Sequence, residues 1–150
     1  MNAPAQKDLF TKRYRKVPLR DPLEERMQIA LHHLLKLTLH DDRVDWWHTP
    51  NGGLRDIKTA AKLKAMGVRP GVADFFFTWA APVSVAAEPH LQKFPQNLFL
   101  ELKRHGQDLT SEQEQFRDSV TAKGSYYEVV DSIDDAIAVL KKYGVLRRTS

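Results

Sequence analysis

The sequence predicts a mixed α/β fold in which a small β-sheet carries helices on both faces. Short apolar runs of strand-like composition alternate with longer segments that repeat apolar residues at helical spacing. Residues that start and stop helices frame the longer segments. The 150 residues are enough for one domain with a single core. We expect the order helix, strand, inserted helix, strand, strand, helix, strand, helix.

Composition excludes several functional classes. The chain has no cysteine, so disulfides, thiolate zinc sites and thiol nucleophiles are impossible. No apolar run approaches the roughly 20 residues that span a membrane, and no secretory signal is recognisable, so we expect an intracellular, cytoplasmic protein. The net charge of +4 favours an anionic partner, with nucleic acid first in line.

Residues 1–20 are predicted to form a basic N-terminal arm, and residues 21–150 a single domain. The arm is either a tail that contacts phosphates or a solvated terminus without a specific role. Six Lys and Arg residues occur in it, namely Lys7, Lys12, Arg13, Arg15, Lys16 and Arg20.

A helix is predicted from Pro22 to about Leu39, with Asp21 as its N-cap. Its expected apolar face comprises Met27, Ala30, Leu31, Leu34 and Leu35. Helical spacing places Glu24 on or beside this face and turns Glu25 toward solvent. A carboxylate on the buried side needs a partner, which is either a basic side chain or a metal site.

A strand is predicted over residues 44–48, followed by a turn or loop over residues 49–53. The backbone N–H groups of Asn51, Gly52 and Gly53 could approach a phosphate, although a plain turn explains the same residues. His48 is open to three interpretations: a general base, a DNA contact or an ordinary residue at the end of a strand.

The next helix is predicted over residues 56–66, with Ile57, Ala60 and Ala61 on one face. Lys58 and Lys62 are four residues apart and share a flank of this helix. Together with Arg55 and Arg69 this flank could follow a nucleic-acid backbone, but a solvated face is the more common reason for such charges.

Residues 97–103 form the strand around which we expect the chain to be organised. Glu101 and Lys103 are two residues apart, so both side chains leave the same face of this strand. Asp74 opens an earlier apolar strand over residues 75–79, and we expect the two strands to pair antiparallel across a long connection at residues 80–96. Asp74 and Glu101 would then share a divalent metal ion. The alternatives are an ordinary surface ion pair for Glu101 and Lys103, and a turn-capping role for Asp74.

The C-terminal part has a near match to a capping box, in which Thr110 is the N-cap and Gln113 its partner. Gln113 could serve only this role. A strand is predicted over residues 126–130, and a final helix starts after Asp131 or Ser132. The expected core face of this last helix comprises Ile133, Ala136, Ile137 and Leu140.

In this order the motifs resemble the VRR-NUC group of the PD-(D/E)XK nuclease superfamily. The resemblance covers about residues 22–143 and rests on residues 48–53, 64–74, 101–103 and 109–113 and on Gly124. It implies a restriction-endonuclease-like core and Mg²⁺- or Mn²⁺-dependent cleavage of DNA. Small stand-alone members resemble Holliday-junction resolvases and nucleases carried by phages, and several act as dimers, which makes a homodimer an expectation here.

The resemblance also assigns roles to residues. It makes Asp74 and Glu101 the metal-binding carboxylates, with the Leu102 carbonyl as a further ligand, and Lys103 the group that holds or activates the attacking water. Glu24 matches the acid of the first helix, and Gln113 matches the motif glutamine. Ala73 departs from the group's pattern, because proline is commoner before the aspartate. The expected DNA-binding residues are His48, Asn51, Gly52, Gly53, Arg55, Lys58, Lys62 and Arg69.

The sequence therefore predicts a metal-dependent DNA endonuclease that hydrolyses phosphodiester bonds, with branched DNA such as Holliday junctions or flaps as an expected substrate. The alternative is a catalytically inactive nucleic-acid-binding module on the same fold. A third class, an α/β protein that is not a nuclease, would leave the basic arm and the loop after His48 unexplained.

Overall fold

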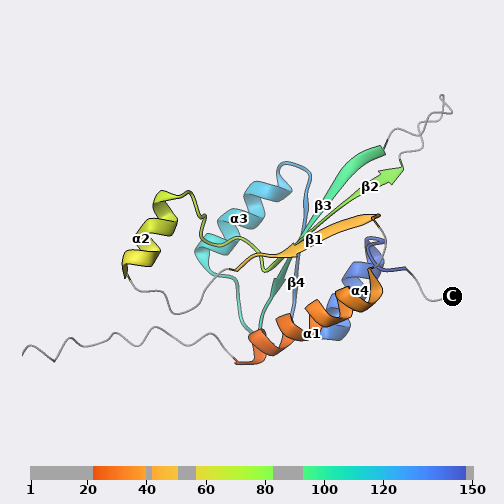
Figure 1. Cartoon of the computed structure of the whole chain (residues 1–150), viewed down its shortest axis with the longest axis horizontal. Helices are drawn as coiled ribbons and strands as arrows, with labels where there is room; N and C mark the ends of the chain where they lie inside the picture. The colour runs from red at the N-terminus through yellow and green to blue at the C-terminus, as the bar shows by residue number, and fades with distance from the viewer. Residues whose placement is uncertain (1–21, 40–41, 51–56, 83–92, 148–150) are drawn as a thin grey trace, which may run out of the picture.

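The computed structural model describes residues 22–39, 42–50, 57–82 and 93–147. The elements follow the predicted order (Figure 1). Their bounds are α1 (Pro22–Thr38), β1 (Val44–His48), α2 (Ile57–Ala65), β2 (Phe75–Pro82), β3 (Lys93–Leu102), α3 (Ser111–Thr121), β4 (Tyr126–Val130) and α4 (Ile133–Lys142). The predicted arm at residues 1–20 lies outside the described residues.

The sheet has the strand order β1-β2-β3-β4. β2 is antiparallel to both β1 and β3, whereas β3 and β4 run parallel. The predicted antiparallel pairing of the strand after Asp74 with the strand that carries Glu101 is therefore confirmed. Both central strands are apolar on both sides because both of their faces are covered.

The two faces of the sheet are covered by different helices (Figure 1). On one face α1 and α4 enclose the main core, whose largest buried side chains are Phe75, Phe77, Leu31, Leu35, Leu98, Leu100, Leu102, Leu140 and Val145. On the other face α3 places Phe116 against Phe99 of β3, with 5.1 Å between ring centroids. Residues alternate between the faces of a strand, so Glu101 and Lys103 share the α3 side with Phe99.

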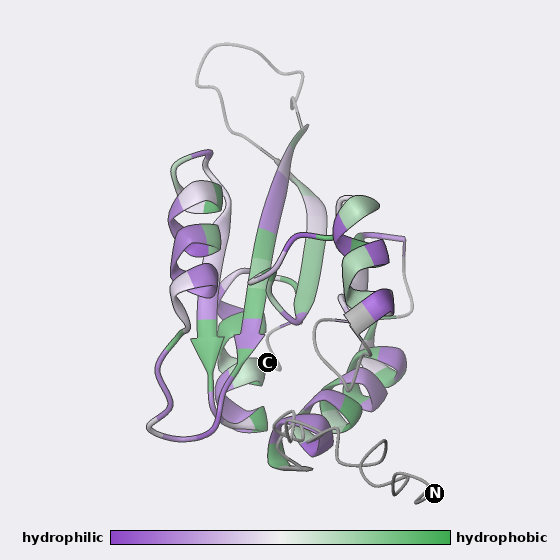
Figure 2. Cartoon of the chain, turned by 90° about the vertical axis from the view of Figure 1, so that its left-hand side faces the viewer, coloured by the Kyte–Doolittle hydropathy of each residue, from purple (hydrophilic) through white to green (hydrophobic). Residues whose placement is uncertain are grey.

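The buried face of α1 differs in one residue from the prediction. Leu31 and Leu35 are buried, Glu24 is half-buried and Glu25 is exposed, as expected. Ala30, however, is exposed, because the buried stripe passes through Gln28 instead. Helix ribbons in Figure 2 accordingly alternate between hydrophobic and hydrophilic residues.

The hairpin between β2 and β3 is longer than predicted. The paired residues extend to Pro82 in β2 and start at Lys93 in β3. The predicted connection at residues 80–96 therefore starts too early and ends too late. This part of β3 pairs only with β2, since its pairing with β4 starts at Leu98. A two-stranded ribbon tolerates Pro95 because the missing N–H can face the side without a partner strand.

Helix α2 extends away from the sheet (Figure 1). Two residues of the predicted apolar face, Ala60 and Ala61, are exposed. Leu63, which the prediction did not place on this face, is half-buried. The prediction of a buried face was wrong for these two alanines, because helical spacing identifies a stripe but not a surface to cover it. Within the described ranges, no helix is long and apolar enough to cross a membrane.

Candidate active site

Asp74 and Glu101 meet at the end of the central strands. Asp74 directly precedes β2 and Glu101 is the penultimate residue of β3, and the pairing of Phe75 with Leu100 sets the two acids side by side. They are 5% and 3% exposed, and Lys103 is 5% exposed. Glu101 and Lys103 are therefore not a surface ion pair, which was one of the alternatives.

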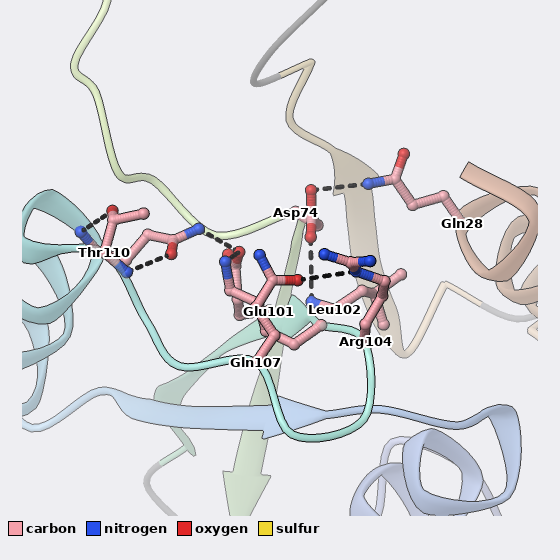
Figure 3. A network of polar contacts seen from close by, with 9 residues as sticks. Gln28, Asp74, Glu101, Leu102, Arg104, Gln107 and Thr110 are labelled. Atoms are coloured by element: carbon pink, nitrogen blue, oxygen red, sulfur yellow. Dashed lines mark hydrogen bonds and ion pairs between the residues drawn. The ribbon is translucent and has the colours of Figure 1, made fainter. Parts of the chain in front are cut away.

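Two N–H groups hold the Asp74 carboxylate in place (Figure 3). The side-chain Nε2 of Gln28 donates to Oδ1 at 2.8 Å, and the backbone N–H of Leu102 donates to Oδ2 at 3.0 Å. Gln28 belongs to α1, so this helix contributes directly to the site. The sequence offered one indication of it: Gln28 lies in one stripe with Leu31 and Leu35, and a polar group in a buried stripe needs a partner.

The two oxygens of Glu101 have different surroundings. Oε1 accepts a hydrogen bond from Nε2 of Gln113 and lies 3.7 Å from Nζ of Lys103. Oε2 is buried and has no hydrogen-bond partner among the residues that the structure describes. A buried carboxylate oxygen without a donor is uncommon, and it marks a position where a ligand would be stabilised.

The electrostatics of this cluster favour a cation. The pKa of Glu101 is raised to about 8, chiefly by burial and then by the negative charge of Asp74; the charge of Glu24 adds to the rise, whereas Lys103 opposes it. A single ammonium group thus does not offset the carboxylates around it. A divalent ion between Asp74 and Glu101 would relieve both the repulsion and the unmet hydrogen-bonding capacity of Oε2, so the residues present fit such an ion.

Gln113 joins the site to the start of α3. Its backbone N–H donates to Oγ1 of Thr110 at 3.3 Å, and its side-chain Oε1 accepts from the backbone N–H of Thr110 at 2.9 Å. This completes the predicted capping box. Because the amide oxygen faces Thr110, the amide N–H₂ must face Glu101. Gln113 is therefore both a capping residue and a direct neighbour of Glu101.

Gly71 brings the segment before Asp74 against the same end of α3. Its φ of +76° is in the left-handed region, and a Cβ added to it would lie 2.3 Å from the backbone oxygen of Glu112. Two residues earlier, the guanidinium carbon of Arg69 lies 5.0 Å from the ring centroid of Phe116. These contacts set the distance between Asp74 and the helix that carries Gln113.

Glu24 lies within electrostatic reach of the site, because its charge contributes to the pKa of Glu101, after burial and Asp74. No group of three His, Cys, Asp or Glu side chains suited to a metal ion occurs in the described part of the chain. A divalent ion would therefore have to be held by the carboxylate pair rather than by such a group, and the Leu102 carbonyl remains a predicted ligand.

The predicted DNA-binding residues are spread over several elements. Lys58 and Lys62 are exposed on α2, and Arg69 is exposed where it packs on α3. His48 pairs with Phe75 at the end of β1 and is half-buried, with 5.2 Å between their ring centroids. Four further residues, Asn51, Gly52, Gly53 and Arg55, lie outside the described residues.

Tyr127 is a neighbour of the site that the sequence did not indicate. It lies on β4, paired with Phe99, and in the described ranges its buried hydroxyl has no hydrogen-bond partner. Its partner Phe99 lies two residues from Glu101 on the same face of β3, and the pKa of Tyr127 is raised chiefly by burial and further by the charges of Glu101 and Asp74.

Comparison with solved structures identifies the class of fold. A structure described as a VRR_NUC domain protein superposes with a TM-score of 0.54, covering 85% of this chain and 93% of its own, at 21% sequence identity. The predicted α/β, restriction-endonuclease-like fold is confirmed, and the resemblance to the VRR-NUC group is supported at the level of the fold. No protein-family model matches the chain, and no curated protein gives a significant match.

Proposed function

We propose that this chain is a metal-dependent DNA endonuclease that hydrolyses phosphodiester bonds. The observation that carries the proposal is the buried pair of Asp74 and Glu101 with Lys103 beside it. The pair lies on a fold shared with a protein whose description names a nuclease domain. A basic net charge of +4 is consistent with a polyanionic substrate.

The carboxylates of Asp74 and Glu101 would hold Mg²⁺ or Mn²⁺, with the Leu102 carbonyl as a further ligand. Hard oxygen donors are what these ions prefer. When bound, such an ion lowers the pKa of a coordinated water and polarises a phosphate oxygen. The fit rests on the buried Oε2 of Glu101, which has no donor in the described structure.

The side chains around the carboxylates have separate roles. Gln28 and Gln113 each donate an amide N–H to one carboxylate and so fix its orientation. The Lys103 ammonium would hold the attacking water or offset the charge that develops on the phosphate. Glu24 would add negative charge at the edge of the site. Branched DNA as the preferred substrate and a homodimer as the active form are further parts of the proposal.

A cleavage panel tests the proposal. Labelled four-way junction, flap, splayed-arm, duplex and single-stranded DNA are incubated with Mg²⁺, Mn²⁺ or EDTA. We expect cleavage of one branched form that needs the metal, and its loss in Asp74→Ala and in Glu101→Ala while folding by circular dichroism is kept. Full activity of either variant would contradict the assignment.

One observation favours a second candidate, an inactive DNA-binding module: the described residues contain two close carboxylates rather than a group of three metal-binding side chains. Lys103→Ala separates the two functions. For a nuclease, turnover falls by about 10²-fold or more whereas DNA affinity changes little. Binding to DNA by the wild type without any cleavage across the panel would support the module.

A further inference from the structure

Aromatic rings form a row across the sheet face that carries Glu101. Centroid distances are 4.4 Å between Trp47 and Phe76, 4.8 Å between Phe76 and Phe99, and 5.1 Å between Phe99 and Phe116. Phe76 and Phe99 are half-buried and Phe116 is buried, whereas Trp47 is 51% exposed. Trp47 is thus the exposed end of a packed row.

The position of Trp47 in β1 explains its exposure. β1 is at one edge of the sheet, and successive side chains alternate between its faces. Trp46 therefore points to the other face, where its ring centroid lies 5.6 Å from that of His32 in α1. Among the described residues, the aromatic ring that packs against Trp47 is that of Phe76. A large planar ring fixed in this way can receive a second flat group at little entropic cost.

Trp47 is close to the candidate active site along the sheet. It pairs with Phe76, and two residues further on the N–H of Thr49 donates to the backbone oxygen of Asp74 at 2.8 Å. Two strand residues correspond to about 7 Å. A nucleic-acid strand with a phosphate at Asp74 and Glu101 could therefore reach Trp47 with a base of the same or the next nucleotide.

We propose that Trp47 stacks on an unpaired base of the bound nucleic-acid strand. A base inside a duplex is already stacked on both sides, so it would have to leave the helix to meet this ring. The ligand class is therefore a strand with an unpaired base beside the phosphate in the site. The proposal rests on the proposed function, because it takes nucleic acid as the ligand.

The charges nearby agree with this placement. Arg69 is exposed on the α3 side, where its guanidinium covers Phe116 at the other end of the aromatic row. Asp45 is exposed on the same face of β1 as Trp47, two strand residues further from Asp74. An acidic group there disfavours phosphate, so the strand is expected to leave the sheet beyond Trp47.

Equilibrium binding tests the proposal in EDTA, where metal-dependent cleavage is absent. The probes are a fluorescein-labelled oligothymidylate of about 15 nucleotides and a blunt duplex of equal length. The variants are Trp47→Ala, Trp47→Leu and Trp47→Phe. Phe94→Ala is the matched control, since Phe94 is 45% exposed but lies seven residues from Glu101 in β3, about 24 Å along the strand.

We expect Trp47→Ala and Trp47→Leu to weaken binding of the oligothymidylate about tenfold or more, which corresponds to the usual contribution of one stacked base. Trp47→Phe keeps an aromatic face and should stay within about threefold of the wild type. Phe94→Ala on the single strand, and all variants on the blunt duplex, should stay within about twofold. Quenching of tryptophan fluorescence by the oligothymidylate should be lost in Trp47→Phe although binding is kept.

Several results would overturn the proposal. These are wild-type affinity of Trp47→Leu, an equal loss on duplex and single strand, or a dimer that dissociates in Trp47→Leu, which would make Trp47 a contact between copies. Failure of the proposed function is separable from this: a wild type that cleaves no DNA but shows the stacking pattern refutes the nuclease alone. Cleavage by the wild type with unchanged binding in Trp47→Leu refutes the stacking alone.

Discussion

Gln28 and Gln113 hold the two acidic side chains with neutral donors. Each amide N–H fixes one carboxylate, to Asp74 in the first case and to Glu101 in the second, without cancelling its charge. An arginine in either position would form a neutral ion pair and remove the need for a cation. The choice of glutamine thus keeps negative charge available in a buried place, where burial first and the charge of Asp74 second destabilise the ionised form of Glu101.

The first prediction concerns the pH dependence of stability without metal. Burial chiefly, and then Asp74, raise the pKa of Glu101 in the folded chain to about 8, compared with an ordinary value of 4.5. Between these values the folded state binds more protons than the unfolded state, so the free energy of unfolding falls as pH rises. Glu101→Gln cannot titrate. In EDTA it should be more stable than the wild type by up to a few kcal/mol at about pH 9, and similar in stability near pH 4.5.

Urea unfolding across this pH range measures the difference. Parallel stability curves for Glu101→Gln and the wild type would contradict the raised pKa. Adding Mg²⁺ or Mn²⁺ at about pH 8 should then raise the melting temperature of the wild type but not that of Glu101→Gln, because an ion that binds only the folded state stabilises it. This readout is independent of cleavage.

At the scale of elements, the start of α3 is the part that aligns the site. Its capping box uses Gln113, and Gly71 brings the chain before Asp74 into backbone contact with Glu112. The two carboxylates are therefore positioned by this helix end, by one pair of strands and, through Gln28, by α1. Small shifts of this helix end would separate Gln113 from Glu101.

The second prediction tests this contact with Gly71→Ala. The new Cβ would meet the Glu112 backbone at 2.3 Å, which backbone atoms cannot relieve without moving. Gly67→Ala is the matched control, because Gly67 also has a positive φ, +87°, but nothing lies within 4 Å of its added Cβ. We expect about 1 kcal/mol of destabilisation for Gly67→Ala and at least about 2 kcal/mol more for Gly71→Ala. Equal losses in urea unfolding would show that the close approach is unimportant.

At the scale of the whole molecule, basic side chains lie on α2, which contributes no described residue to the main core cluster. α2 extends from the sheet and exposes Lys58 and Lys62, four residues apart. An exposed helix face with two ammonium groups contributes little to packing, but it is well suited to contact with a long polyanion. A solvated helix face remains the alternative for these charges.

The third prediction distinguishes these explanations by salt dependence. If both lysines contact phosphates, the Lys58→Ala and Lys62→Ala double variant should lower the slope of log affinity for duplex DNA against log salt by about 1.8. Lys142→Ala is the control, since its ammonium already pairs with Glu128 at 2.8 Å and should leave the slope unchanged. A slope unchanged in the double variant would identify the lysines as solvated.

Local spacing in the sequence determined the order of elements, the common face of Glu101 and Lys103, and the capping box at Thr110 and Gln113. These features depend on residues within a few positions of one another, and strand alternation and helix capping act over that range. The pairing of the Asp74 and Glu101 strands was also predictable, because consecutive strands usually pair.

Only the tertiary structure decided which distant side chains complete the site. Gln28 meets Asp74 across 46 residues, and Tyr127 comes near Glu101 from a strand added in parallel. The exposure of Ala60 likewise depends on whether another element packs against α2. The length of the β2–β3 hairpin depends on how far the two strands pair. Periodicity indicates that a side chain can be buried, but its partner is set by how the chain packs against itself, and that packing is what turns two acids into a buried, charge-rich site.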